Sequence, residues 1–239
     1  MSQYDMLSEK YSFLASLEPV KQFVQYPSVL HYLGGLFEVK ILDIGCGDGV
    51  VSRLLANKGA IVTGFDISNQ QIKLAQKLSC SNKKINYFVS EPILFKPKIL
   101  FDKVFANMVL AYAKDKNNLQ DFFDCAFRVL KEEGTFFVCD VNKENIPLEE
   151  KYYGRTWHIL EDNTYLLNFN VKETQSFSIK IPYYSLDEFK ICAKKAGFKI
   201  EKVFYLEPFD AGIIKKGKKF WDRLKNKPIF FGMICKKVK

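Results

Sequence analysis

Apolar and polar positions follow two different periods along the first 141 residues. Five short, nearly continuous apolar runs are typical of strands buried in a parallel sheet, and they are 38–44, 60–66, 85–89, 101–108 and 135–141. Segments with apolar side chains at helical spacing lie between them, at 49–59, 68–79 and 115–134. This alternation of strand and helix predicts an open, doubly wound α/β sheet.

The pattern changes after residue 141. Two or three extended strands are predicted next, in "RTWHIL", "TYLLNFNV" and "TQSFSIKIPYY". A helix is then predicted from its N-cap Ser185 and the capping-box residue Glu188 to the stop at Gly197. The chain ends with a strand "KIEKVFYL", a basic helical segment around 211–226 and a last strand "IFFGMICKKV".

No linker rich in Gly, Ser or Pro divides the chain, so we expect one domain over residues 1–239. Its predicted parts are an N-terminal helical cap (1–37), a cofactor-binding half (38–141), a lid-like insertion (142–184) and a C-terminal helix with the last strands (185–239).

Composition narrows the class of protein. The chain has 48% hydrophobic and 26% charged residues, and its longest apolar core run, 104–113, is half the roughly 20 residues that cross a bilayer. No secretory signal begins the chain, so we expect a cytoplasmic protein without membrane contacts. The six cysteines form no C-x-x-C pair, which predicts neither a disulfide framework nor a metal site.

The positive charge is concentrated at one end. The net charge is +9, and residues 190–239 hold 15 Lys and Arg against 4 Asp and Glu. Such asymmetry can mark a patch that binds nucleic acid or a membrane, but a solvated lysine-rich face has the same composition. Only one of these cations, Arg223, is an arginine, so nucleic acid is disfavoured as a partner.

The most informative stretch is "LDIGCGDG" at residues 42–49. A glycine-rich turn between strand and helix offers free backbone N–H groups at the positive end of a helix dipole. Because Gly45, Gly47 and Gly49 lack side chains, a ligand can lie against the backbone. Asp66 ends the next strand and can accept hydrogen bonds from both hydroxyls of a ribose. The pattern predicts an adenosine-containing cofactor.

The glycine spacing indicates which cofactor. A dinucleotide loop reads G-x-G-x-x-G and holds a pyrophosphate, whereas this loop reads G-x-G-x-G and follows Asp43. A carboxylate repels a pyrophosphate but suits the cationic amino group of an amino-acid tail. The stretch resembles the first motif of the class I methyltransferases, which bind S-adenosylmethionine.

The resemblance covers residues 38–141 and implies further contacts. It places Glu91 near the adenine amino group, although an aspartate is commoner there, and the backbone near Asn107 and Met108 along the methionine part. The segment "YDMLSEKY" resembles an N-terminal helix that closes over the cofactor, with Tyr4 and Tyr11 facing the site. The cofactor contacts so predicted are Tyr11, Asp43, Gly45, Cys46, Gly47, Asp66, Ile67, Glu91, Asn107 and Met108.

The implied fold is a Rossmann-like, mostly parallel seven-stranded sheet with an antiparallel last strand, an N-terminal helical cap and a strand-rich insertion after the fifth strand. "PYYSLDEFKICAKKAGF" and "FWDRLKNKPIFF" also resemble toxoflavin-biosynthesis-like methyltransferases, whose acceptors are small heterocycles. The predicted activity is methyl transfer to O or N of a small aromatic or heterocyclic molecule, by a monomer or homodimer.

The methyl donor carries its own driving force, so a catalytic base is optional, and the sequence assigns none. The candidates are His158, His31 and Tyr112, with Glu161 behind them. The aromatic residues of the insertion suggest a flat acceptor or an ordinary core. The alternatives that stay open are an RNA or protein methyltransferase using the basic C-terminal segment, a nicotinamide-dependent oxidoreductase, and a non-catalytic cofactor-binding protein.

Overall fold

A seven-stranded sheet forms the centre of the molecule. The computed structural model describes residues 17–80, 82–162, 164–172 and 175–238. The strand order is β3-β2-β1-β4-β5-β10-β9, with β10 antiparallel to both neighbours and the first five strands parallel. The strands are β1 (Lys40–Ile44), β2 (Ile61–Asp66), β3 (Ile85–Val89), β4 (Phe101–Asn107), β5 (Leu130–Val141), β9 (Phe198–Tyr205) and β10 (Phe230–Lys237). The predicted sheet is thereby confirmed.

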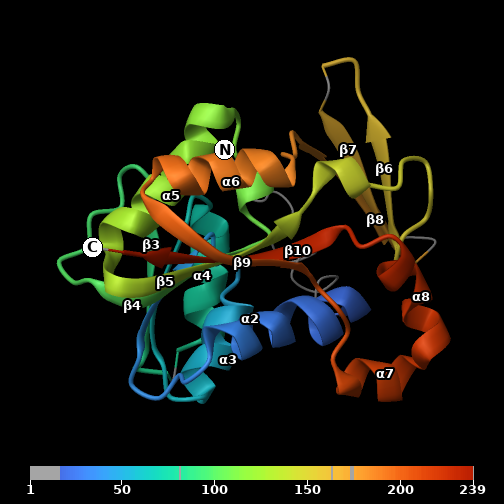
Figure 1. Ribbon diagram of the computed structural model, residues 1–239. Helices are drawn as coiled ribbons and strands as arrows, with labels where there is room; N and C mark the ends of the chain where they lie inside the picture. Colours follow the sequence, from blue (N-terminus) through green and yellow to red (C-terminus); the bar gives the residue numbers. More distant parts are fainter. Residues whose placement is uncertain (1–16, 81, 163, 173–174, 239) are drawn as a thin grey trace.

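Helices cover both faces of this sheet, as Figure 1 shows with α5 and α6 above it and α2 and α3 below it. The helices are α2 (Tyr26–Leu33), α3 (Val50–Asn57), α4 (Asn69–Leu78), α5 (Lys116–Val129), α6 (Leu186–Lys195), α7 (Asp210–Lys216) and α8 (Lys218–Asn226). A π-helical turn, η1 (Lys21–Gln25), continues directly into α2, and short 3-10 turns lie at Leu110–Tyr112 and Lys143–Asn145. The basic helical segment predicted around 211–226 is present as two helices, because Gly217 has φ +81° and separates α7 from α8.

The chain changes direction across the sheet at β1. From this central strand it runs outward through β2 and β3, then returns to pair β4 with the other edge of β1. The carboxyl ends of β2, β1 and β4 therefore lie side by side, with their crossover helices on opposite faces. In doubly wound folds this switch point leaves a crevice where ligands bind.

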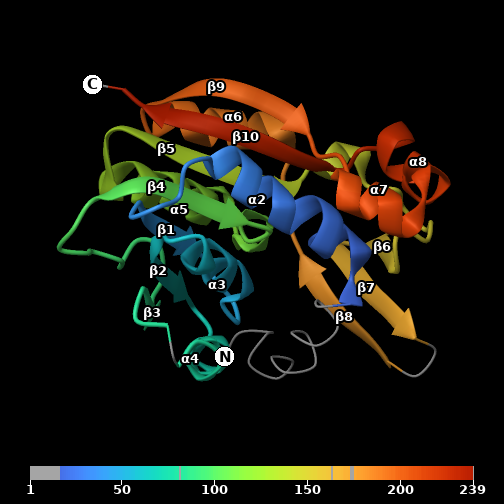
Figure 2. The ribbon, with the colours of Figure 1, turned by 90° about the horizontal axis from the view of Figure 1, so that it is seen from below.

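The insertion forms a second, smaller sheet. Strands β6 (Arg155–Ile159), β7 (Tyr165–Lys172) and β8 (Gln175–Ile181) pair antiparallel in sequence order, as the extended segments predicted. Figure 2 shows this sheet projecting from the end of the molecule where α7 and α8 also lie. Trp157 of β6 is fully buried and donates from Nε1 to the Tyr183 hydroxyl at 3.0 Å, which anchors the small sheet to the chain leading back to α6.

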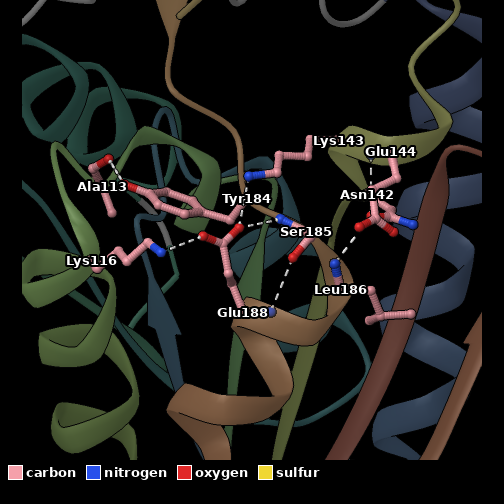
Figure 3. A network of polar contacts seen from close by, with 9 residues as sticks. All are labelled: Ala113, Lys116, Asn142, Lys143, Glu144, Tyr184, Ser185, Leu186 and Glu188. Atoms are coloured by element: carbon pink, nitrogen blue, oxygen red, sulfur yellow. Dashed lines mark hydrogen bonds and ion pairs between the residues drawn. The ribbon is translucent and has the colours of Figure 1, made fainter. Parts of the chain in front are cut away.

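A polar junction returns the chain from the insertion to the main sheet (Figure 3). Ser185 caps α6, and the predicted capping box with Glu188 is present. The Glu188 carboxylate also meets Lys116 at 3.1 Å and Lys143 at 2.9 Å. Burial opposes the charged form, but the hydrogen bond from the Ser185 N–H and the two ammonium groups outweigh it and lower the pKa of Glu188 to about 2.

The N-terminal cap is described from residue 17 onward. Tyr4 and Tyr11, expected to face the cofactor, lie outside the described residues. Among the described helices, none has the length and apolar composition needed to cross a membrane. The expected cytoplasmic location stays a prediction.

Candidate functional site

Three polar side chains stand at the switch point, one from each of three neighbouring strands. Asp43 lies near the end of β1, Asp66 ends β2 and Asn107 ends β4. The parallel register pairs Asp43 with Gly64 on one side and Phe105 on the other, so all three side chains meet at one edge of the sheet. Two carboxylates and an amide thus flank the glycine loop.

The three loop glycines have positive φ values of +67° at Gly45, +54° at Gly47 and +76° at Gly49. A Cβ at Gly45 would lie 2.2 Å from Val109 Cγ2, and one at Gly49 would lie 2.2 Å from the Tyr87 hydroxyl. Only at Gly47 is there room, because the nearest atom would be 3.9 Å away. The backbone of Gly45 and of Gly47 lines the cavity described below, so a ligand lying against it stays a prediction. At Gly45 and Gly49 the missing side chain also permits close packing.

Asp66 is held by the loop that it faces. Its Oδ2 accepts from the Gly47 N–H at 3.0 Å, and its Oδ1 accepts from the Ser68 N–H at 2.9 Å. An ionised carboxylate has about four acceptor positions, more than these two hydrogen bonds use. This fixed orientation suits a bidentate contact with a diol.

Asp43 is buried, with 3% of its surface exposed. Its Oδ2 accepts a 2.6 Å hydrogen bond from the Ser52 hydroxyl at the start of α3. Burial raises the pKa of Asp43 to about 7, against the lowering effect of the Ser52 hydrogen bond, and the nearby Asp66 and Asp48 raise it further. A cation placed beside this carboxyl would favour its ionised form.

A cavity of about 140 Å³ runs along the glycine loop between these side chains and the N-terminal cap. Among the described residues, its wall holds buried polar atoms without a hydrogen-bond partner: Asn107 Oδ1, Gln71 Oε1 and both amide atoms of Gln25. Such orphaned groups are costly in a dry interior and are satisfied by a polar ligand. These unpaired groups, three amide oxygens that accept and one amide nitrogen that donates, therefore fit a ligand rich in hydroxyl and amino groups.

A second cavity, of about 230 Å³, adjoins the first beyond Asp66 and is lined by Glu91, Pro92 and Phe122. Together the two cavities are lined by nine residues predicted to contact the cofactor: Asp43, Gly45, Cys46, Gly47, Asp66, Ile67, Glu91, Asn107 and Met108. Burial raises the pKa of the Cys46 thiol well above its ordinary value, so this thiol stays neutral. The individual roles of these residues remain predictions.

Met108 marks the boundary with a third cavity. It has φ +58°, uncommon for a residue with a side chain, and its N–H donates to the Cys139 carbonyl at 2.7 Å. The third cavity lies on its far side and is mostly apolar and aromatic. Its lining is Lys21, Met108, Ala111, Tyr112, Arg155, Leu167, Phe169, Ile181 and Tyr183. The insertion thus supplies the wall opposite the switch point.

A buried ion pair holds that wall to the N-terminal cap. Arg155 donates from Nε and Nη2 to the two carboxylate oxygens of Glu18, at 3.0 and 2.8 Å. The Arg155 side chain is 4% exposed and that of Glu18 is 8% exposed. The guanidinium also lies over the rings of Phe169 and Phe230, at 5.6 and 5.3 Å from their centroids. Segments 137 residues apart thus meet beside the third cavity.

Of the catalytic candidates, only Tyr112 lines these cavities, and it borders all three. His31 is exposed on α2 against Phe209, and His158 on β6 pairs through Nδ1 with Glu149 at 2.6 Å. Glu161 is exposed after β6. None of these three is among the described residues that line the cavities.

Two residues that line the cavities could not be predicted from the sequence. Lys21 and Gln25 stand one helical turn apart in "KQFVQY" and are buried, with 6% and 0% exposed. Only their burial against the glycine loop distinguishes them from ordinary polar helix positions. Lys21 borders both the first and the third cavity.

The sheet order, the glycine loop with its two acids and the polar cavity at the switch point define a class I methyltransferase fold, whose cofactor is S-adenosylmethionine. A family model described as a methyltransferase domain matches residues 7–203. The chain belongs to this family, and the predicted resemblance is confirmed.

Individual relatives agree with this class. The ubiquinone biosynthesis O-methyltransferase of Pelagibacter ubique is 37% identical over 109 residues, 45% of this chain and 44% of that protein. The demethylmenaquinone methyltransferase of Tropheryma whipplei is 26% identical over 66% of each chain. The CcbJ methyltransferase of Streptomyces caelestis superposes with a TM-score of 0.70 at 17% identity, over 99% of this chain and 97% of that one. The chain spans less than half the length of its Pelagibacter relative.

Proposed function

We propose that this protein transfers a methyl group from S-adenosylmethionine to an oxygen or nitrogen of a small, flat, largely apolar acceptor. The observation that carries the proposal is the meeting of a polar cavity and an apolar cavity at Met108 and Tyr112. The cofactor supplies an electrophilic methyl on a positively charged sulfur. The O-methyltransferase named among the relatives supports oxygen as the acceptor atom.

The residues of the first two cavities fit the donor. Asp66 would accept the ribose hydroxyls, and Asp43 would lie near the amino group of the methionine arm, where the Asn107 and Gln25 side chains offer unpaired acceptors. Glu91 would accept from the adenine amino group in the adjoining cavity. These side chains bind and orient; the backbone at Gly47 lets the arm lie close.

The acceptor would approach from the third cavity, past Met108. The third cavity has a volume of about 20 Å³, which holds about one water molecule. An aromatic ring therefore enters only when the walls of the cavity separate. We propose that the insertion, whose strands β7 and β8 form one wall of the third cavity, moves as a lid and excludes water during methyl transfer. Tyr112 borders all three cavities, so its hydroxyl would lie near both reactants and orient the acceptor group through a hydrogen bond.

Cofactor binding tests the first half of the proposal. By calorimetry we expect S-adenosylhomocysteine to bind in the micromolar range and NAD not to bind. Asp66→Asn should weaken binding by about 1.5–3 kcal/mol, because a charged acceptor is lost while the shape is kept. Glu201→Gln, which removes an exposed carboxylate of β9, is the matched control and should change nothing. Equal binding of NAD, or unchanged binding by Asp66→Asn, would contradict the assignment.

Acceptor choice tests the second half. Release of S-adenosylhomocysteine should appear with small hydroxylated aromatic compounds and not with generic RNA or protein, and Tyr112→Phe should lower kcat more than it raises KM. Turnover only with RNA or protein would favour the alternative acceptors, and cofactor binding without turnover on any acceptor would favour a non-catalytic role.

A further inference from the structure

Helices α7 and α8 carry six Lys and Arg against two Asp, and four of the lysines lie on an exposed face that the proposed chemistry leaves unused. Two lysines precede Gly217 and two follow it, and all four are exposed: Lys215, Lys216, Lys218 and Lys219. None of the four forms an ion pair with an acid among the described residues, whereas Arg223 and Lys227 of the same region both pair with Glu150. We call residues 214–220 the basic face.

Apolar side chains border these lysines on the basic face. Ile214 is 85% exposed, more than any other large hydrophobic side chain in the described part of the chain. Phe220 is 37% exposed at the other end of the face. The basic face therefore presents cationic and apolar side chains together on one exposed surface.

Hydrogen bonds connect the helices of the basic face to the elements that form the walls of the third cavity. On one side, the Phe209 N–H donates to the Phe23 carbonyl at 3.0 Å, which fixes α7 on the turn η1 that carries Lys21. On the other side, the Tyr153 hydroxyl donates to the Phe220 carbonyl at 2.9 Å. Tyr153 precedes Arg155, which lines the third cavity, by two residues. Figure 2 shows α7 and α8 at the same end of the molecule as β6–β8.

We propose that the basic face docks this protein on the surface of an anionic lipid bilayer. The lysines complement the negative surface potential, each strengthening partition by about fivefold, and Ile214 and Phe220 enter the headgroup region. This docking would bring the mouth of the third cavity close to the membrane, so acceptors dissolved in lipid could reach it. The inference does not depend on the proposed acceptor.

The chemistry of the basic face favours lipid over nucleic acid. Nucleic-acid surfaces use arginine forks and exposed aromatic rings for stacking, whereas this face has four lysines, and its one ring, Phe220, packs edge-on against Trp221 with centroids 4.8 Å apart. An exposed isoleucine contributes nothing to phosphate or base contacts, but it gains from burial among acyl chains.

Vesicle sedimentation with the full chain tests the proposal. We expect binding to vesicles of phosphatidylcholine with about one-third phosphatidylglycerol, weakening as salt rises, and no binding to phosphatidylcholine alone. Replacing the four lysines by glutamine should lower the partition coefficient at least a hundredfold. The matched control replaces four exposed lysines elsewhere, Lys58, Lys73, Lys77 and Lys83, and should retain most of the binding.

A second variant separates lipid from nucleic acid. Ile214→Ser keeps the charge and should lower vesicle binding severalfold while leaving any weak binding to single-stranded RNA unchanged. Thermal unfolding should show both variants folded, since the altered side chains are exposed. The proposal is overturned if anionic vesicles do not bind, if the control lowers binding as much as the basic-face variant, or if RNA binds more tightly than the vesicles.

Discussion

The two halves of the site differ in how they are built. The cofactor half consists of loops that follow β1, β2 and β4, with side chains held by hydrogen bonds between near neighbours in the fold, and its cavities of about 140 and 230 Å³ are open. The acceptor half is assembled from the N-terminal cap and the insertion, joined by the buried Glu18–Arg155 pair around only about 20 Å³. A preformed donor site thus faces an acceptor site that must open.

We expect different substitutions to disrupt the cofactor half and the acceptor half. Arg155→Met should show the largest effect, a loss of about 3–5 kcal/mol in the free energy of unfolding, because it leaves the Glu18 carboxylate buried and unpaired. Denaturant unfolding measures it. The double variant Glu18→Leu/Arg155→Met should recover most of the loss, and the folded protein should still bind S-adenosylhomocysteine. A double variant as unstable as the single would mean that packing, rather than the unpaired charge, dominates.

Gly45→Ala should disrupt the cofactor half instead. The new Cβ would stand 2.2 Å from Val109 Cγ2 at a residue with φ +67°, so we expect about 2–3 kcal/mol of destabilisation and loss of cofactor binding. Gly35→Ala is the matched control, since nothing lies within 4 Å of its Cβ position and its φ is not in the left-handed region. It should be neutral or slightly stabilising. Cofactor binding retained by Gly45→Ala would show that the loop tolerates a shift of Val109.

The pH dependence of cofactor binding sharpens the assignment of Asp43. Its pKa of about 7 means that the carboxylate needed beside a cationic amino group forms only as the pH rises, so affinity should increase up to tenfold between pH 6 and 7.5. Asp43→Asn should flatten this profile. Ser52→Ala removes the hydrogen bond that favours ionisation and should move the profile to higher pH. Calorimetry over this pH range measures all three.

The raised pKa values of two buried carboxyl groups, Asp43 and Asp140, also determine how stability should change with pH. Burial raises the pKa of Asp43 and of Asp140 to about 7, above their ordinary value near 3.8. Between these pH values the folded chain binds protons that the unfolded chain has released, so this contribution to stability should fall as the pH rises from 4 to 7 and stay constant above 7. Glu188 has the opposite sign, because its lowered pKa gives a contribution that is present above pH 4.5 and lost towards pH 2.

Glu188→Gln should have the smallest effect on stability and should leave both halves of the site unchanged. It weakens the capping box and two partly exposed ion pairs, so we expect about 1 kcal/mol of lost stability and unchanged cofactor affinity. Asp187→Asn, which alters only an exposed pair with Lys190 on the same helix, is the control for a change of charge. Loss of cofactor affinity in Glu188→Gln would mean that the junction in Figure 3 also positions the switch point.

The alternation of the first five strands with helices, the glycine loop with Asp43 and Asp66, and the capping box at Ser185 could all be predicted, because each depends on residues close together in the chain. The remaining features of the site depend on tertiary contacts. Lys21 and Gln25 join the site, and Glu18 meets Arg155, because segments far apart in sequence pack together. Local spacing carries no information about such long-range contacts. For the same reason the two histidines, plausible by residue type, were placed away from the cavities by the packing of α2 and β6.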